Sequence, residues 1–216
     1  MGIFILRIAV FVSGRGSNLK AILDSRDIQY NIEVKAVVSD KIDCPAFSIA
    51  QKFSILTFSV GNKIGFVNYE ELSESLQSLE VELIVLAGYL KLIPNNFLSL
   101  YKGKIINIHP ALLPSFGGKG MYGINVHKAV FESSAKVSGA TVHFVDETYD
   151  TGKIIMQRCI DISDVKSPEE IADRVLNIEH EILPFVLNKF AEGKIKIVGK
   201  RVIINSNIIS LIRIFN

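Results

Sequence analysis

Residues 6–23 read LRIAVFVSGRGSNLKAIL and contain, in order, a strand, a glycine-rich loop and the start of a helix. The run at 6–12 is almost entirely apolar, which is typical of a strand that a sheet buries on both faces. Two glycines follow, and glycine lets the backbone turn sharply. Residues 17–25 then have the spacing of a helix. This unit predicts an α/β protein.

The same alternation continues along the chain. We expect strands near residues 6–12, 32–39, 54–58, 82–87, 104–109, 137–145 and 153–160, and helices near 17–25, 44–53, 66–79, 124–133 and 168–190. Alternating strands and helices make the strands parallel. The connections after about residue 134 and around 146–152 are short, which favours antiparallel strands at one edge. The prediction is an α/β fold with a mainly parallel, twisted sheet and an antiparallel edge.

The chain has 216 residues, of which 49% are hydrophobic and 21% charged, a composition that suits one domain with a full core. We expect this domain to cover residues 1–200. Residues 201–216 are an apolar extension whose alternation is too irregular to assign. An added hairpin and a subunit contact both remain open for it, and the chain is expected to be a monomer or a homodimer.

The formal net charge is +2, and Lys and Arg are scattered, so we expect neither nucleic-acid nor membrane partners. No apolar run reaches the roughly 18 residues that span a bilayer. Arg7 interrupts the apolar amino terminus, which argues against a signal peptide. Cys44 and Cys159 lack the spacing of metal ligands, so we predict reduced thiols and no metal site. A cytoplasmic protein with small-molecule substrates is expected.

The motif NIHPALLP at residues 107–114 is the feature that indicates chemistry. Side chains two apart on a strand point to one face, so Asn107 and His109 should face the same space. Pro110 cannot donate a hydrogen bond to a sheet, which predicts that the strand ends at His109. An amide and an imidazole then project together at the carboxyl end of a strand, where open α/β sheets bind ligands.

Asp150 lies in a turn some forty residues downstream, where Asp is also expected merely as a turn former. If the fold brings Asp150 against His109, the carboxylate should raise the pKa of the imidazole and fix its tautomer. Thr141 and His143 share one face of the strand near 137–145, which indicates either a wet pocket or an exposed strand face.

The loop SGRGSN at residues 13–18 precedes a helix start, and the N–H groups of such a start attract phosphate. A Walker loop and the dinucleotide fingerprint both fit poorly, although Asp40 after the second strand keeps the dinucleotide hypothesis open. The alternative is an ordinary turn in which Ser17 or Asn18 caps the helix.

The helix near 168–190 should begin at Ser167 as N-cap, with Pro168 at the first helical position and Glu170 completing a capping box. Glu179 falls inside the apolar stripe of this helix, and a buried carboxylate needs a partner. A bound polar substrate is one candidate, and Arg174 or a buried water is the other.

Four motifs together resemble the phosphoribosylglycinamide formyltransferases, a folate-dependent family of purine biosynthesis. They are SGRGSNL at 13–19, LAGYLKLI at 86–93, NIHPALLP at 107–114 and VHFVDE at 142–147. The likeness covers roughly residues 7–200. It implies a formyltransferase fold with a Rossmann-like sheet and helices on both faces. It also implies that the amine of glycinamide ribonucleotide takes the formyl group of 10-formyltetrahydrofolate, without a metal.

The resemblance also implies roles for individual residues. Asn107, His109 and Asp150 match the catalytic trio of the family. The phosphate loop corresponds to Gly16, Ser17 and Asn18, and Glu179 matches the carboxylate that holds the ribonucleotide. The folate pocket would be lined by Leu90, Lys91, Leu92 and Ile93 together with Asn107, with the turn at 146–150 closing around the pterin.

The chain departs from this family pattern in two places. Lys91 stands where arginine is common, which is a mild change. No arginine lies near residues 63–66, where relatives often carry one that faces the folate tail. Lys63 is a candidate replacement, but lysine lacks the bidentate grip of arginine on a carboxylate.

Three other functions compete with formyl transfer to the ribonucleotide. A formyltetrahydrofolate hydrolase would use the same trio with water as nucleophile, although the phosphate loop and Glu179 favour a phosphorylated acceptor. A methionyl-tRNA formyltransferase should have a more basic surface. A nucleotide-binding module without catalysis would bind a dinucleotide at the glycine loop.

Overall fold

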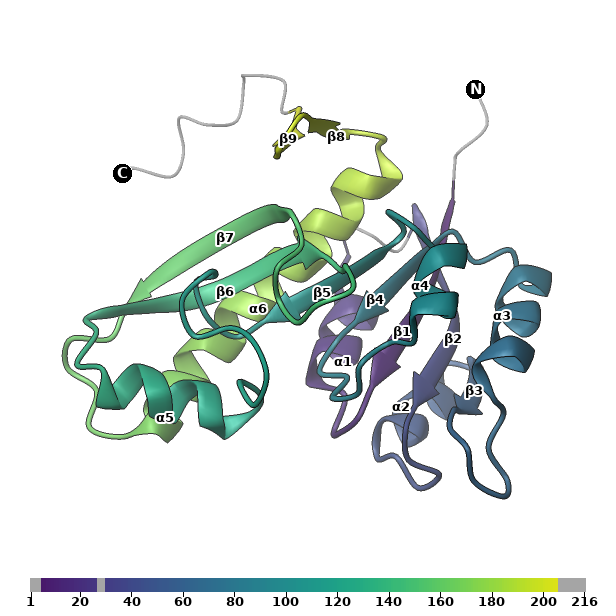
Figure 1. The fold of residues 1–216 in the computed structure, drawn as a ribbon, viewed down its shortest axis with the longest axis horizontal. Helices are drawn as coiled ribbons and strands as arrows, with labels where there is room; N and C mark the ends of the chain where they lie inside the picture. The colour runs from purple at the N-terminus through teal and green to yellow at the C-terminus, as the bar shows by residue number, and fades with distance from the viewer. Residues whose placement is uncertain (1–4, 27–29, 206–216) are drawn as a thin grey trace.

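The computed structural model describes residues 5–26 and 30–205. A seven-stranded sheet forms its centre, with strand order β3-β2-β1-β4-β5-β6-β7 (Figure 1). The strands are β1 (Leu6–Val12), β2 (Ile32–Ser39), β3 (Leu56–Ser59), β4 (Leu83–Leu86), β5 (Ile105–His109), β6 (Val137–Phe144) and β7 (Ile154–Asp161). The pairs among β1 to β5 are parallel, whereas β6 is antiparallel to both β5 and β7. The predicted fold class is confirmed.

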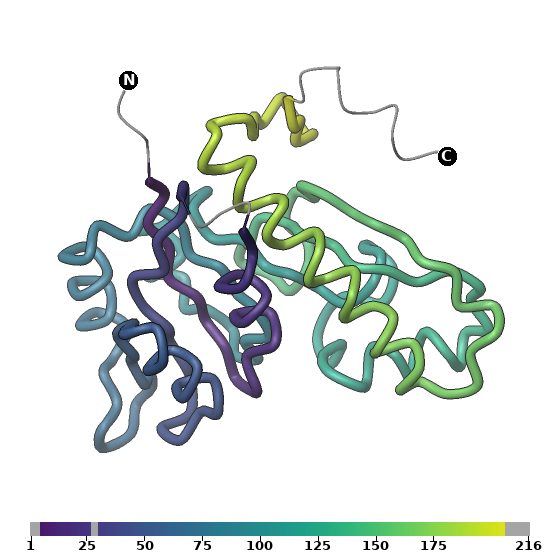
Figure 2. Tube along the Cα trace, turned by 180° about the vertical axis from the view of Figure 1, so that it is seen from behind, coloured from purple at the N-terminus to yellow at the C-terminus, as the bar shows by residue number. Residues whose placement is uncertain are grey.

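Helices cover both faces of this sheet. One apolar core includes residues of α1 (Ser17–Asp24), α2 (Ala46–Lys52), α5 (Ile124–Glu132) and α6 (Pro168–Ala191). Figure 2 shows α1 and α6 side by side on that face. The opposite core includes α3 (Tyr69–Ser78) and α4 (Asn95–Leu100). The sequence did not predict α4, because six residues after Pro94 are too few to display a helical period.

The first strand explains why a sheet forms here. Ile8 and Val10 belong to one core, Ala9 and Phe11 belong to the other, and all four are fully buried. A strand that is apolar on both faces needs helices on both sides to remove it from water. This matches the reading of residues 6–12 as a buried strand.

Capping side chains define where the helices α3 and α6 begin. Asn68 caps α3 in a complete capping box with Glu71. Ser167 caps α6 as predicted and accepts a hydrogen bond from the amide of Glu170. The carboxylate of Glu170, however, accepts from the amide of Lys166, so the reciprocal half of the predicted capping box is wrong.

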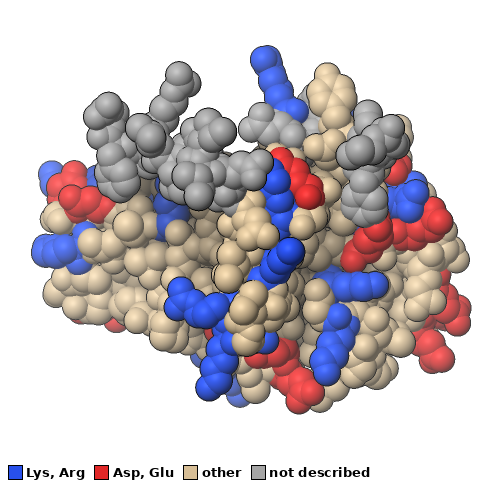
Figure 3. All heavy atoms as spheres, turned by 90° about the horizontal axis from the view of Figure 1, so that it is seen from above, with Lys and Arg blue, Asp and Glu red and all other residues tan. Residues whose placement is uncertain are grey.

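The chain continues after α6 into a two-stranded hairpin of β8 (Ile195–Val198) and β9 (Arg201–Ile204). Of the two alternatives for residues 201–216, residues 201–204 therefore form a hairpin, and residues 206–216 lie outside the described residues. Within the described ranges, no helix is long and apolar enough to cross a membrane. Basic and acidic side chains are interspersed on the face drawn in Figure 3.

The strand order predicts where a ligand would bind. From β1 the chain moves outward to β2 and β3, and it then returns to the other side of β1 to form β4. The loops after β1 and β4 consequently diverge at the carboxyl ends of adjacent parallel strands. Open α/β sheets bind ligands in the crevice at such a switch point.

Candidate active site

A cavity of about 740 Å³ lies at this switch point. It is lined by the loop after β1, the segment after β4, the end of β5, the loop before α5, the turn after β6 and one face of α6. Segments far apart in the sequence thus share one cavity. All eleven residues that the sequence singled out as site residues line it, namely Gly16, Ser17, Asn18, Leu90, Lys91, Leu92, Ile93, Asn107, His109, Asp150 and Glu179.

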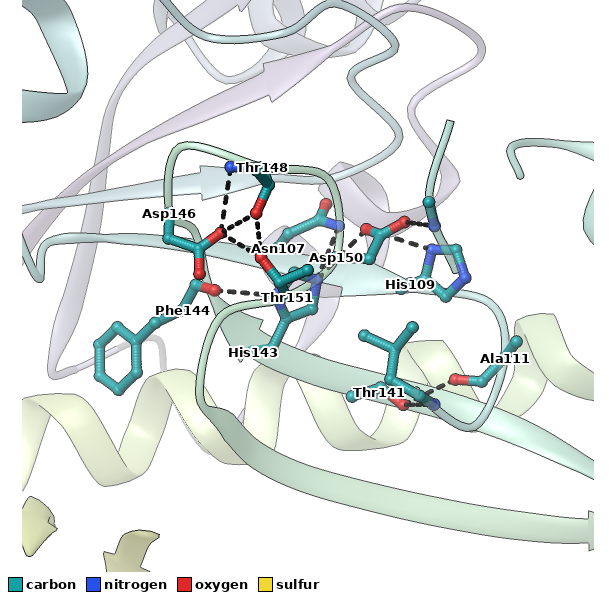
Figure 4. Close-up of polar contacts among 12 residues, drawn as sticks. Asn107, His109, Ala111, Thr141, His143, Phe144, Asp146, Thr148, Asp150 and Thr151 are labelled. Carbon is teal, nitrogen blue, oxygen red and sulfur yellow. Dashed lines mark hydrogen bonds and ion pairs between the residues drawn. The ribbon is translucent and has the colours of Figure 1, made fainter. Parts of the chain in front are cut away.

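The Asp150 carboxylate lies between the rings of His109 and His143, and all three residues line the cavity (Figure 4). Its Oδ1 atom is 3.6 Å from Nδ1 of His109 and 3.6 Å from Nε2 of His143. His109 is the last residue of β5, as predicted, and Asn107 stands two residues earlier on the same strand. The fold therefore brings Asp150 against His109, which sequence spacing alone could not establish.

Both nitrogens of the His109 ring face acceptor atoms. Nε2 donates a hydrogen bond of 2.9 Å to the carbonyl oxygen of Phe116, and Nδ1 faces Asp150. Only a protonated imidazole can donate from both nitrogens. The loop after β5 thus holds the ring in one orientation through a backbone carbonyl.

The net effect on the pKa of His109 differs from the prediction. Burial lowers the pKa of His109, and this outweighs the opposite effects of the Asp150 carboxylate and the Phe116 carbonyl. The Asp150 carboxylate does raise the pKa of His109, as predicted, but the prediction left out the cost of charging a ring that is 3% exposed, and this cost is larger.

Asp150 is itself held in place by the backbone. Its φ is 57°, which is rare for a residue with a side chain, and its Oδ2 accepts a hydrogen bond of 2.8 Å from the amide of Gly118. Burial raises the pKa of this carboxyl, but the neighbouring His143 and His109 rings and the hydrogen bond from the Gly118 amide together lower it below its ordinary value. The carboxylate is therefore charged at neutral pH.

His143 orients the amide of Asn107. Nδ1 of His143 donates over 2.8 Å to the carbonyl oxygen of Phe144, and with the proton on Nδ1 the other ring nitrogen, Nε2, can accept a hydrogen bond. Nδ2 of Asn107 donates to that atom over 3.1 Å. One N–H of the Asn107 amide is then used within the protein, and its second N–H is available to a ligand.

Thr141 does not line the cavity, and its side chain bonds the backbone of the loop after β5 instead. Its hydroxyl donates to the carbonyl of Ala111 over 2.6 Å and accepts from the amide of Leu113 over 3.1 Å. It is fully buried and does not line the cavity, whereas His143 does. The exposed-face alternative is wrong for both residues, and only His143 belongs to the pocket.

The glycine loop ends in a helix start without a side-chain cap. Gly16 is the N-cap of α1 with φ 77°, and within the described part of the chain no side chain caps this helix. A Cβ at Gly16 would lie 2.7 Å from Cβ of Ala46, so glycine is required by space as well as by backbone conformation. The alternative in which Ser17 or Asn18 caps the helix is wrong.

Asn18 instead forms a hydrogen bond with the carboxyl group of Glu179 in α6. Its Nδ2 donates 2.6 Å to Oε2 of Glu179, while its Oδ1 is buried without a partner among the described residues. Burial raises the pKa of Glu179 to about 7, although the bond from Asn18 lowers it in part. Arg174, the alternative partner for Glu179, pairs with Asp164 instead.

The segment after β4 is hydrogen-bonded to Ser13, at the start of the glycine loop. The Ser13 hydroxyl donates 2.6 Å to Oδ1 of Asp40 and accepts from the amide of Leu90 over 2.9 Å. Asp40 is therefore engaged within the protein and does not line the cavity, which removes the carboxylate that the dinucleotide hypothesis needs. Leu90 and Leu92 are partly exposed along the cavity, as an apolar ligand surface would be.

The formyl transferase family model matches residues 6–187. The chain belongs to the formyl transferase family. It is 40% identical over 189 residues to a phosphoribosylglycinamide formyltransferase of Bacillus subtilis, covering 85% of this chain and 93% of the relative. It is 43% identical over 195 residues to a chloroplastic phosphoribosylglycinamide formyltransferase of Arabidopsis thaliana, covering 88% of this chain and 67% of the relative.

A solved structure of the family agrees with this fold. The crystal structure of phosphoribosylglycinamide formyltransferase from Anaplasma phagocytophilum superposes with a TM-score of 0.85 at 33% identity. The match covers 94% of this chain and 96% of that one. The family resemblance that the four sequence motifs predicted is confirmed.

One departure from the usual formyl transferase sequence is visible in the structure. Lys63 does not line the cavity, and its ammonium group lies 5.9 Å from the centre of the Phe66 ring. Lys91 lines the cavity. The cation nearest to the predicted folate segment is therefore in the segment itself rather than in the loop at 63–66.

The sequence analysis gave no role to His127 in α5, yet His127 lines the pocket of this formyl transferase. Helical spacing gives the face on which a residue lies, but it cannot tell whether that face meets the core or a cavity.

Proposed function

We propose that this chain transfers the formyl group of 10-formyltetrahydrofolate to the amine of N1-(5-phosphoribosyl)glycinamide, in de novo purine biosynthesis. The observation that carries the proposal is the single cavity in which a phosphate-type loop, the Asn107, His109 and Asp150 trio and an apolar segment meet. Phosphoribosylglycinamide formyltransferase is also the name of relatives that are 40% and 43% identical.

The glycine loop and the segment after β4 line the cavity with different chemistry, and this supports a different substrate for each. Gly16, Ser17 and Asn18 lie at the start of α1, where uncapped N–H groups and the helix dipole favour a phosphate. Glu179 stands beside them and can accept from sugar hydroxyls. The segment from Leu90 to Ile93 presents apolar surface for the folate ring system.

The reaction requires stabilisation of a tetrahedral oxyanion and the movement of one proton. The amine nitrogen bonds to the formyl carbon, the bond from that carbon to the folate nitrogen breaks, and the amine loses a proton while the folate nitrogen gains one. In this proposal the free N–H of Asn107 donates to the oxyanion. The substrate oxygen replaces the Phe116 carbonyl as the partner of Nε2 of His109.

Asp150 has a positioning and electrostatic role in this proposal. Its charge partly offsets the burial that lowers the pKa of His109, and it holds Nδ1 toward itself so that Nε2 faces the reacting group. If ligand binding shortens the 3.6 Å distance between Nδ1 of His109 and Oδ1 of Asp150, the carboxylate would stabilise the imidazolium that forms during the reaction. The pair then supplies and removes the proton.

A formyl transfer assay on the purified protein tests the proposal. His109→Ala and Asn107→Ala should each lower kcat by about 10²–10³, the usual cost of losing one oxyanion donor. Changes of Ser17 or Asn18 should mainly raise the KM for the ribonucleotide. His180→Ala serves as the control, since His180 does not line the cavity. Unchanged turnover in His109→Ala would defeat the mechanism.

Simple measurements test two of the three rival functions, the hydrolase and the nucleotide-binding module. Formate released at the transfer rate without acceptor would indicate a hydrolase acting on formyltetrahydrofolate. Tight binding of a dinucleotide without binding of a folate analogue would indicate a binding module. The engagement of Asp40 by Ser13 disfavours the second rival.

The remaining expectations are also proposals. We infer a metal-free reaction at the trio, a monomer or homodimer, and a cytoplasmic location, whereas the name of the Arabidopsis thaliana relative places that protein in the chloroplast. Retention of activity after dialysis against a chelator, sedimentation of the purified protein and fractionation of the source cells would test these three points.

A further inference from the structure

The segment between β2 and α2 contacts the glycine loop on the side away from the cavity. The Lys41 ammonium donates a hydrogen bond of 2.6 Å to the carbonyl oxygen of Ser13, and the Cys44 thiol donates over 3.4 Å to the carbonyl oxygen of Gly14. No residue of this segment or of α2, both of which the structure describes in full, lines the cavity, whereas Gly14 and Arg15 do. The loop therefore lies between this segment and the cavity.

These two hydrogen bonds fix the direction of two backbone amides. In a planar trans peptide the C=O and N–H groups point in opposite directions. The carbonyl of Ser13 points at Lys41, so the N–H of Gly14 points to the other side of the loop, where the cavity lies. The carbonyl of Gly14 and the N–H of Arg15 are related in the same way. Within the described residues, neither amide donates to another backbone group, so both can donate to a ligand.

The charge of Lys41 acts on the peptide that it bonds. A charged donor polarises the peptide group that accepts its hydrogen bond, and this makes the N–H of the same peptide a better donor. The carboxylate of Asp40 lies close by, since it accepts from the Ser13 hydroxyl, and it offsets part of the charge of Lys41 at longer range. The bonded peptide, rather than a long-range field, is therefore the route by which Lys41 affects a ligand in the cavity.

We propose that Lys41 is a positioning residue that acts through the Ser13 carbonyl and directs the Gly14 amide at the phosphate of the ribonucleotide. This inference rests on the proposed function. Lys41 does not touch the substrate, because it does not line the cavity. A phosphate has several acceptor oxygens, so it can bond the Gly14 amide together with the uncapped amides at the start of α1.

Three variants and two acceptors test this role. Lys41→Met removes the ammonium, Lys41→Arg keeps a charged donor, and Lys52→Met is the control, since Lys52 is exposed in α2 and does not line the cavity. We expect Lys41→Met to lower kcat/KM for the ribonucleotide about 10-fold, the effect of one lost hydrogen bond, mainly through KM. It should leave kcat/KM for the ribonucleoside that lacks the phosphate, and the folate KM, unchanged. Lys41→Arg should restore most of the loss.

A purely structural role of Lys41 would produce another pattern. Lys41→Met would then lower kcat/KM equally for the acceptors with and without the phosphate, or would leave both unchanged, and either result would overturn the inference. An equal loss in Lys52→Met would also overturn it, because the effect would then come from the net charge of the chain rather than from the bond to Ser13.

Titration with inorganic phosphate tests the inference without catalysis. The amide signal of Gly14 in a ¹H–¹⁵N NMR spectrum of the unaltered chain should shift when phosphate is added, and not when sodium chloride is added to the same ionic strength. Lys41→Met should need about 10-fold more phosphate for the same shift. No shift of this amide at saturating phosphate, or an equal phosphate requirement in the two chains, would reject the proposal.

The failure of this inference is distinguishable from the failure of the proposed function. If the unaltered chain does not transfer formyl groups to the ribonucleotide, the proposed function is wrong, and the phosphate titration still tests Lys41. If it does transfer them and Lys41→Met is equally active, only the role of Lys41 is wrong.

Discussion

Replacing Glu179 with glutamine should remove a pH-dependent loss of stability. Glu179 is 8% exposed, and burial raises its pKa from 4.5 to about 7. Asn18 donates to the carboxyl group through Nδ2, and it can donate in the same way to the side-chain oxygen of a glutamine. Glutamine therefore keeps this hydrogen bond and cannot become charged.

The sign and size of the effect follow from the two pKa values of Glu179. Below pH 4.5 the carboxyl is protonated in both the folded and the unfolded chain, so it has no pH effect on stability. Between pH 4.5 and about 7 the unfolded chain loses this proton first, so the free energy of unfolding falls as pH rises. Above that range the loss is complete and amounts to about 3 kcal/mol.

Urea unfolding at a series of pH values from 4.5 to 8 would measure this effect. The difference in unfolding free energy between Glu179→Gln and the original chain should change by about 3 kcal/mol in favour of the variant as pH rises. Glu181→Gln is the matched control, because Glu181 lies in the same helix with an exposed side chain. A pH-independent difference for Glu179→Gln would refute a raised pKa at Glu179.

Two further changes test how the site is built. In Gly152→Ala the new Cβ would lie 1.7 Å from the carbonyl oxygen of Phe144, so the turn must shift. We expect a loss of about 1–3 kcal/mol in unfolding free energy and a lower kcat. In Ser13→Ala, Asp40 and the amide of Leu90 lose their shared partner. We expect a loss of about 1–3 kcal/mol and a higher KM for the folate co-substrate.

Controls for these two changes come from the same chain. Gly14→Ala serves for stability, since nothing lies within 4 Å of the added Cβ. Ser48→Ala removes an exposed hydroxyl that bonds only within its own helix start. If Gly152→Ala unfolds like Gly14→Ala, the close contact does not constrain the turn. An unchanged folate KM in Ser13→Ala would show that Ser13 does not position the Leu90 segment.

The main elements and several of their ends could be predicted from the sequence. The apolar run at 6–12 indicated a strand buried on both faces, and Pro110 predicted the end of β5 at His109. Both predictions were possible because the apolar pattern and the effect of a proline depend only on residues that are close in the sequence. Ser167 predicted the start of α6 for the same reason. The short helix α4 carried no period long enough to be recognised.

The sequence by itself determined the local conformation, the order of the elements and the family, since hydrophobic period, capping and turn chemistry are properties of neighbouring residues. Only the tertiary structure decided that Asp150 meets His109, that Asn18 meets Glu179, and that His127 faces the cavity. It also decided the direction of the His109 pKa. That balance depends on burial, and burial is set by segments that meet only when the whole chain has folded.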